Sequence, residues 1–218
     1  ALLGFAGEKA ATFQIFIQLG AILAVAVLYR ARLVQVLTFS RAGGDAGGAF
    51  GRVGWLLLAL TTLPPLILGV LAYDTIKERL FSPPVVAVGW IAGGAALLVV
   101  ERIRPEKVRD GLDAVRPRDA LAIGLCQCLS LWPGVSRAAS TISGAMLVGL
   151  DRKTAAEYSF LAAIPLLTGA VAYDLYASRD LLSAADLPMF AVGFAVAFAT
   201  AWLAVTWFLR LLGEHTLR

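Results

Sequence analysis

Charged residues are scarce in this sequence. Asp, Glu, Lys and Arg make up 16% of its 218 residues, whereas a water-soluble domain contains about 25%. Hydrophobic residues make up 59%, and the mean hydropathy is +0.79. This composition excludes a water-soluble fold. It also excludes intrinsic disorder, which requires low hydrophobicity and high charge. The sequence therefore predicts an integral membrane protein.

Histidine and cysteine are nearly absent. The single histidine, His215, stands near the end of the sequence, where we expect a solvated side chain. Cys126 and Cys128 are two positions apart in an apolar run, which is too close for an ordinary disulfide. They also lack the second pair that a zinc site needs. Neither residue type predicts a metal centre, and we expect both cysteines to be small buried residues.

Six apolar segments are long enough to lie in a membrane, where a spanning helix needs about 20 residues. They cover residues 13–29, 53–73, 84–101, 120–150, 155–173 and 187–209. We therefore predict an all-α integral membrane protein with one polytopic domain over residues 1–218.

The segment 120–150 differs from the others. Its 31 residues would form a helix about 46 Å long, whereas the hydrocarbon core is about 30 Å thick. Pro133 and Gly134 interrupt it near the middle. Because proline removes a helix hydrogen bond and glycine frees the backbone, we predict two half-helices that meet at this pair.

Basic residues predict the sidedness of the segments. The loops 30–52 and 102–119 hold four and six of them, whereas the loops 74–83 and 174–186 hold two and one. The positive-inside rule makes the first two loops cytoplasmic and the last two external. If 155–173 spans, then 120–150 must enter and leave on the cytoplasmic side, as a re-entrant hairpin. The excess of 19 Lys and Arg over 15 Asp and Glu thus reflects sidedness, and nucleic acid is not a predicted partner.

Polar residues gather at the tip of this hairpin. Arg137 follows the break at membrane depth, where an arginine without a partner costs several kcal/mol. The start of the second half-helix offers free N–H groups and a positive dipole end, and the guanidinium adds a two-point grip on phosphate. Ser136, Ser140 and Thr141 add hydroxyls on adjoining helix faces. The pattern predicts a phosphate-type anion site; a helix-packing site would explain the serines but not the arginine.

Three other polar residues interrupt apolar segments. Glu157 pairs with Arg137, holds a cation, or is a first-turn carboxylate favoured by the helix dipole, and the sequence leaves these roles open. Gln18 and Gln127 are uncharged, and hydrogen bonding between helices is the favoured role for both.

One stretch of the hairpin resembles a known signature. It reads Gln127-Cys128-Leu129, then Trp132-Pro133-Gly134-Val135-Ser136-Arg137-Ala138-Ala139-Ser140-Thr141-Ile142. It closely resembles the Pro-Gly-x-Ser-Arg-Ser-x-x-Thr signature of the bacterial undecaprenyl-pyrophosphate phosphatase family, which is linked to bacitracin resistance. The likeness continues at Ala155–Leu161 and through nearly all of the chain. Ala138 stands where the family often has its second serine, and Ser140 can substitute nearby.

The resemblance implies hydrolysis of undecaprenyl pyrophosphate to undecaprenyl phosphate and inorganic phosphate. This reaction recycles the lipid carrier of peptidoglycan synthesis in the bacterial inner membrane. The implied cofactor is a divalent cation, Mg²⁺ or Ca²⁺, and a homodimer is compatible with the family. The site residues are assigned as Arg137, Ser136 and Thr141 for catalysis, Gly134, Ser140 and Gln127 for phosphate binding, and Glu157 and Gln18 for support.

Family folds of this kind are inverted repeats, and Lys9–Ala26 weakly echoes Lys153–Ala170. The second copy has a hairpin in front of it, so we expect a first hairpin before Ala1 and a closing helix after Arg218. In the family that first hairpin carries glutamates and a histidine for catalysis and metal binding. The 218-residue chain alone is therefore expected to bind its substrate without turning it over.

Two other functions would use the same features. A flippase or transporter for a phosphorylated polyprenyl lipid needs an inverted repeat and a midplane anion site, but no hydrolysis. A non-catalytic lipid-binding protein needs only the apolar helices. Release of phosphate from a polyprenyl pyrophosphate separates the phosphatase from both.

Overall fold

The computed structural model describes residues 8–37, 49–72, 76, 79–80, 82–103, 105, 108–177, 179 and 186–214. Within these ranges the regular structure is helical, apart from an isolated bridge between Arg109 and Leu150. The predicted all-α fold is therefore confirmed. Contacts group the chain into two units, residues 1–30 with 163–218, and residues 31–162.

The described residues include four helices that are long and apolar enough to cross a membrane, or five if α1 and α2 together form one span. In a membrane only helices of this kind can satisfy their own backbone polar groups. Four of the five predicted spans coincide with the four helices, and the fifth, 13–29, falls on α1, which qualifies only together with α2 across a bend of 81°. The observed bounds are Glu8–Leu28 for α1, Ala49–Leu71 for α3, Pro83–Ile103 for α5, Arg152–Ala177 for α8 and Leu187–Glu214 for α9.

A polar loop is predicted over residues 30–52, and this prediction is wrong at both ends, because α3 already begins at Ala49 and the first part is helical too. Arg30–Leu37 forms helix α2. These eight residues contain neither glycine nor proline, and Val36 is buried. A Cβ atom on Gly54 of α3 would lie 2.6 Å from Val36 Cγ2, so this glycine gives α2 the room to pack. Residues 38–48, with their glycine-rich stretch, lie outside the described residues.

The hairpin predicted at 120–150 is present. Helix α6, Pro117–Gln127, continues into a 3-10 turn, Cys128–Leu131, and helix α7, Arg137–Leu147, returns. Gly134 has a φ of +99°, in the left-handed region that residues with side chains rarely adopt. A Cβ at this position would also collide with the carbonyl oxygen of Val86 on α5. The Pro-Gly pair therefore makes the break, as predicted.

Both ends of the hairpin meet at Arg109. Its guanidinium donates to Asp119 Oδ2 at 2.8 Å in the first turn of α6, and to the Val148 carbonyl at 2.7 Å just after α7. Its backbone N–H donates to the Gly149 carbonyl at 2.8 Å, and its carbonyl accepts from Asp151 N at 3.0 Å. Because one residue binds both ends, the hairpin returns to the side from which it starts, as a re-entrant segment requires.

We expect the two ends of the hairpin to be accessible from the cytoplasm alone. Arg118 and Lys153 flank the hairpin and have exposed side chains. Single cysteines at these positions, in a chain with Cys126 and Cys128 replaced by serine, should react with an impermeant maleimide in inverted vesicles but not in spheroplasts. A cysteine at Arg179 should show the reverse pattern and serves as the control. Labelling of positions 118 and 153 from opposite faces would contradict the re-entrant topology.

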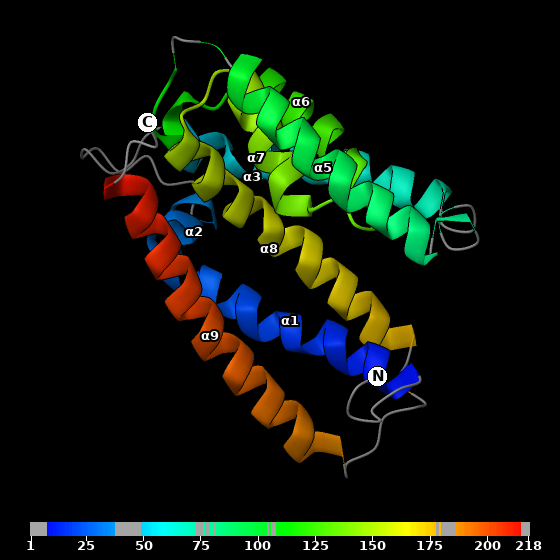
Figure 1. Cartoon of the computed structure of the whole chain (residues 1–218). Helices are drawn as coiled ribbons and strands as arrows, with labels where there is room; N and C mark the ends of the chain where they lie inside the picture. Colours follow the sequence, from blue (N-terminus) through cyan, green and yellow to red (C-terminus); the bar gives the residue numbers. More distant parts are fainter. Residues whose placement is uncertain are drawn as a thin grey trace. The chain divides into compact units, whose positions relative to one another are not determined.

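Helix α5 lies against the hairpin and is held at both ends (Figure 1). Near its start, Trp132 Nε1 at the hairpin tip donates to the Val85 carbonyl at 3.1 Å. Near its end, Glu101 accepts two hydrogen bonds from the Arg152 guanidinium at the start of α8, one of them at 2.9 Å from Nε. These contacts fix the position of α5 beside both arms of the hairpin.

Helices α1 and α9 pack side by side in the other unit (Figure 1). Glycines at the interface permit the close approach, since a Cβ on Gly20 would meet the Phe194 carbonyl and one on Gly193 would lie 2.6 Å from the Phe13 ring. The rings of Phe13 and Phe190 meet edge to face, with centroids 5.3 Å apart. Small residues at a helix contact are typical of membrane proteins.

Candidate anion site at the hairpin tip

The tip presents the N-terminus of α7. Ser136 is the N-cap residue, and its Oγ accepts a hydrogen bond from Ala139 N at 3.3 Å. The first intrahelical bond runs from Ser140 N to the Ser136 carbonyl at 2.9 Å. The N–H groups of Arg137 and Ala138 precede it and have no acceptor within the helix. They leave a partial positive charge at the tip, which favours an anion.

Arg137 adds a full positive charge to this helix end. Its half-buried guanidinium makes one hydrogen bond in the described part of the chain, from Nη1 to the Ser159 carbonyl of α8 at 3.3 Å. None of the described carboxylates forms an ion pair with it. A cation at membrane depth without a counter-charge is costly. An anionic group that occupies its remaining N–H donors would relieve that cost.

Two buried donors near Arg137 have no hydrogen-bond partner in the part of the chain that the structure describes. Gln127 is fully buried, and its Oε1 accepts from Thr141 Oγ1 at 2.9 Å, but among the described residues its Nε2 has no acceptor. The hydroxyl of Ser159, which is 1% exposed, likewise lacks a partner there. Leaving a buried donor unpaired costs about 1–3 kcal/mol. Both groups can serve a ligand that enters the site.

The three hydroxyls predicted at the tip are used differently. Thr141 is fully buried, and its hydroxyl lies 2.9 Å from both Gln127 Oε1 and the Arg137 carbonyl, so it ties α7 to α6. Ser140 donates to the Ser136 carbonyl at 3.0 Å. Ser136 is exposed, and since its Oγ accepts from the backbone, its own proton remains for a ligand oxygen. Of the three hydroxyls, that of Ser136 is the most accessible.

The two supporting residues belong to different units, Glu157 to that of the site and Gln18 to the other. Glu157 is half-buried on α8, and the charges that act on its carboxylate are those of Lys153, Arg32 and Asp151. Its pairing with Arg137, one of the roles left open by the sequence, is not formed. Gln18 is exposed on α1, in the other unit. The interhelical hydrogen bond favoured for Gln127 is confirmed by its contact with Thr141.

The hydroxyl groups of Tyr158 and Thr61 fix helix α8 next to the hairpin. Tyr158 is fully buried, and its hydroxyl donates to the Leu57 carbonyl of α3 at 3.0 Å. It also lies 2.7 Å from Thr61 Oγ1, which donates to the Ala120 carbonyl of α6 at 3.0 Å. These bonds join three helices in the interior and hold Ser159, the next residue, against Arg137. Sequence reasoning missed the role of Ser159, although a serine two positions after Glu157 in an apolar helix was a signal that could have found it.

A divalent cation would need a different set of ligands. In the ranges that the structure covers, no group of three His, Cys, Asp or Glu side chains could hold a metal ion. Arginine, glutamine and serine donors at the tip suit phosphate oxygens, whereas Mg²⁺ and Ca²⁺ prefer carboxylates and carbonyls. The described residues do not fit the ion, and the Mg²⁺ or Ca²⁺ of the resemblance stays a prediction.

Comparisons with known proteins identify the family of this chain. The profile of the family described as Bacitracin resistance protein BacA matches residues 1–218. A protein of Maridesulfovibrio salexigens named Undecaprenyl-diphosphatase is 51% identical over 217 residues, which are 100% of this chain and 81% of that protein. Proteins with the same name from Oleidesulfovibrio alaskensis and Nitratidesulfovibrio vulgaris (strain DP4) are 49% and 50% identical, over 100% of this chain and 81% and 80% of their own lengths. The chain therefore belongs to the BacA family of bacitracin resistance proteins.

Proposed function

We propose that this protein hydrolyses undecaprenyl pyrophosphate to undecaprenyl phosphate and inorganic phosphate in the bacterial inner membrane. Family membership and relatives named Undecaprenyl-diphosphatase support the reaction. The structural observation that carries it is Arg137, a cation at the N-terminus of α7 with no carboxylate partner among the described residues. The product returns the lipid carrier to peptidoglycan synthesis, which accounts for resistance to bacitracin.

Arg137 is the principal catalytic residue of this proposal. In the overall reaction the oxygen of a water molecule becomes bonded to the terminal phosphorus as the anhydride P–O bond breaks, and the protons of the water are shared between the products and the solvent. The bridging oxygen leaves with undecaprenyl phosphate as negative charge grows on it. A guanidinium can donate to two phosphate oxygens at once and neutralise part of this charge. The free N–H groups at the start of α7 act in the same direction, and because they are already oriented, little reorganisation is needed.

The other polar groups complete the grip on the phosphates. Ser136 supplies an exposed hydroxyl at the tip, and Gly134 keeps the backbone open beside it. Gln127 Nε2 and Ser159 Oγ supply buried donors on the inner side. Thr141 acts through Gln127, since its hydroxyl holds the amide in place. The assignment adds Ser159 to the residues proposed from the sequence.

Phosphate release by the purified enzyme tests the reaction. Because the 218-residue chain alone is expected to bind without turnover, the test uses the chain together with the first hairpin expected before it. In detergent with undecaprenyl pyrophosphate we expect this protein to release inorganic phosphate, and we expect Arg137→Ala to abolish most of the release. Arg102→Ala removes an exposed arginine at the end of α5 and should leave the rate unchanged. Movement of the lipid across a vesicle membrane without phosphate release would favour the flippase instead. A homodimer stays a prediction, which the mass of the protein–detergent complex tests.

A further inference from the structure

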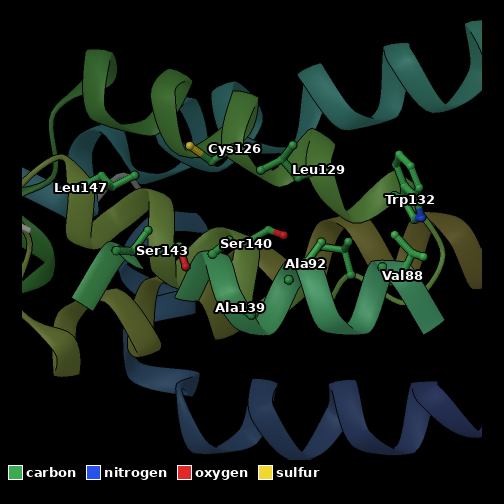
Figure 2. A pocket seen from close by; sticks show the side chains of 14 residues that line it. Val88, Ala92, Cys126, Leu129, Trp132, Ala139, Ser140, Ser143 and Leu147 are labelled. Carbon is green, nitrogen blue, oxygen red and sulfur yellow. The ribbon is translucent and has the colours of Figure 1, made fainter. Parts of the chain in front are cut away.

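An apolar cavity of about 310 Å³ lies between α5 and the two arms of the hairpin. Figure 2 shows side chains from all three elements around it, among them Ala92 of α5, Leu129 of the first arm and Ser140 of the second. The volume is at the lower end of the range of about 300–1,000 Å³ in which proteins bind small molecules. The cavity therefore has room for a short apolar segment of a ligand.

The cavity lies next to the helix turn that carries the anion site. Ser140 lines it, and the hydroxyl of Ser140 donates to the Ser136 carbonyl at the N-cap of α7. Arg137 begins this helix, less than one turn before Ser140, and a turn rises about 5.4 Å. A ligand with an anionic head at Arg137 thus meets an apolar space directly beside that head.

The wall formed by α5 consists mainly of small residues. Close helix packing explains one of them, because a Cβ on Gly89 would lie 2.5 Å from the Pro133 carbonyl. It does not explain Gly93, where a Cβ would lie 3.7 Å from its nearest neighbour, Val135, at an ordinary contact distance. Ala92 and Ala96 line the same cavity. Gly89 is therefore needed for close helix packing, whereas Ala92, Gly93 and Ala96 border the empty volume of the cavity.

The opposite face of α5 carries large apolar side chains. Trp90, Ile91 and Leu98 are 69%, 75% and 73% exposed, as expected for a spanning helix in contact with lipid. The cavity is thus separated from the surrounding acyl chains by one helix. Since α5 is fixed at its two ends by Trp132 and Arg152, the cavity persists without a ligand to hold it open.

We propose that this cavity holds the first isoprene units of the substrate, those attached to the pyrophosphate bound at Arg137. The inference rests on the proposed function, which supplies a long prenyl chain joined to an anionic head. The cavity lies less than one helix turn from Arg137, is lined mainly by apolar groups and is too small for the whole chain. The remaining units extend from it into the bilayer. Gly93 and Ala96 are then specificity-determining residues, because they leave the space that the chain occupies.

Adjacent glycines of α5 provide a matched pair of test variants. Gly93→Leu fills the cavity, whereas a Cβ on Gly94 meets no atom within 4 Å, and Gly94→Leu extends outward. Both changes replace a helical glycine with the same residue. We expect Gly93→Leu to lower kcat/KM for undecaprenyl pyrophosphate at least about tenfold, mainly through KM. All rates are those of the chain that includes the expected first hairpin. Hydrolysis of methyl pyrophosphate, which has no isoprene unit, should stay within about twofold, and Gly94→Leu should change neither.

The placement of the prenyl chain and the proposed reaction can fail separately in this experiment. Equal effects of Gly93→Leu and Gly94→Leu, or an equal loss with both substrates, would overturn the placement of the chain. Failure of the proposed function gives a different result, since neither substrate would then release phosphate in the parent protein. Arg137→Ala should reduce turnover of both substrates, which separates loss of the head site from loss of the tail site.

The two cysteines allow a test that does not depend on turnover. Cys126 lines the cavity and Cys128 does not, although both are half-buried and free. In Cys128→Ser, undecaprenyl phosphate should slow the reaction of Cys126 with an apolar maleimide at least about fivefold, by occupying the space beside the thiol. Inorganic phosphate should not slow it, and Cys128 in Cys126→Ser should be unaffected by either compound. Equal protection of both cysteines, or none by the lipid, would overturn the proposal.

Discussion

In a protein that includes the expected first hairpin, Arg137→Lys should lower kcat/KM for undecaprenyl pyrophosphate at least about tenfold, a loss of about 1.4 kcal/mol of transition-state stabilisation. Lysine keeps the positive charge but has no planar fork to bind two phosphate oxygens. The ammonium group is also more strongly hydrated, so it is costlier to hold at the half-buried position of Arg137. The hydrogen bonds from the guanidinium to the phosphate oxygens strengthen as negative charge develops on these oxygens in the transition state. Most of the loss should therefore appear in kcat.

Two further variants define the effect at Arg137. Arg137→Ala removes the charge as well as the fork, and we expect it to cost about a hundredfold or more, as for other groups that stabilise developing charge. Arg102→Lys changes an exposed arginine in the same way and should be silent. Initial rates over a range of substrate concentrations give both parameters. An Arg137→Lys enzyme with activity within about twofold of the parent would show that the arginine is structural.

Arg109→Met should destabilise the protein by about 3 kcal/mol, at the lower end of the range for a broken buried ion pair. The Asp119 side chain is 6% exposed and would lose the guanidinium at 2.8 Å, while the Val148 carbonyl would lose its donor at 2.7 Å. The lower end applies because the Arg109 side chain is 28% exposed and because Arg116 N still donates to Asp119. A lower thermal midpoint of the detergent-solubilised protein measures the loss.

Arg118→Met is the matched control for Arg109. Its side chain is 75% exposed, and its Nε lies 3.8 Å from the same carboxylate, Asp119. An exposed pair of this kind contributes at most about 1 kcal/mol, so the midpoint should barely move. If both variants cost the same, the contact with Val148 contributes nothing, and Arg109 does not hold the hairpin ends together.

Most of the helices and the hairpin could be predicted because their causes are local. A spanning helix needs only an unbroken apolar run, and the break at Pro133 and Gly134 follows from the geometry of those two residues. Arg137 could be identified as an anion-binding residue because a charge in an apolar segment needs a partner. These inferences require no knowledge of what lies nearby in space.

The remaining features depend on contacts between distant residues. Counting basic residues treats Arg109 and Arg118 alike, yet Arg109 binds both ends of the hairpin and Arg118 is largely exposed. Polarity alone predicts a loop at α2, because the burial of Val36 against α3 is a tertiary effect. The role of Ser159 likewise arises only when α8 packs beside α7. The weak repeat falls on α1 and α8, and its inverted symmetry stays a prediction.

The position of Arg109 in the chain has a consequence for synthesis at the ribosome. Arg109 precedes the hairpin, and its last backbone partner is Asp151, so every group that closes the hairpin has been made before most of α8 and all of α9. Helix α5, which covers the hairpin, has also been completed by then. The hairpin can therefore close during translation, and the last contact that Arg137 gains is the carbonyl of Ser159, as α8 is inserted. The anion site is therefore complete only after α8 has been inserted, whereas the hairpin that carries Arg137 can form before that.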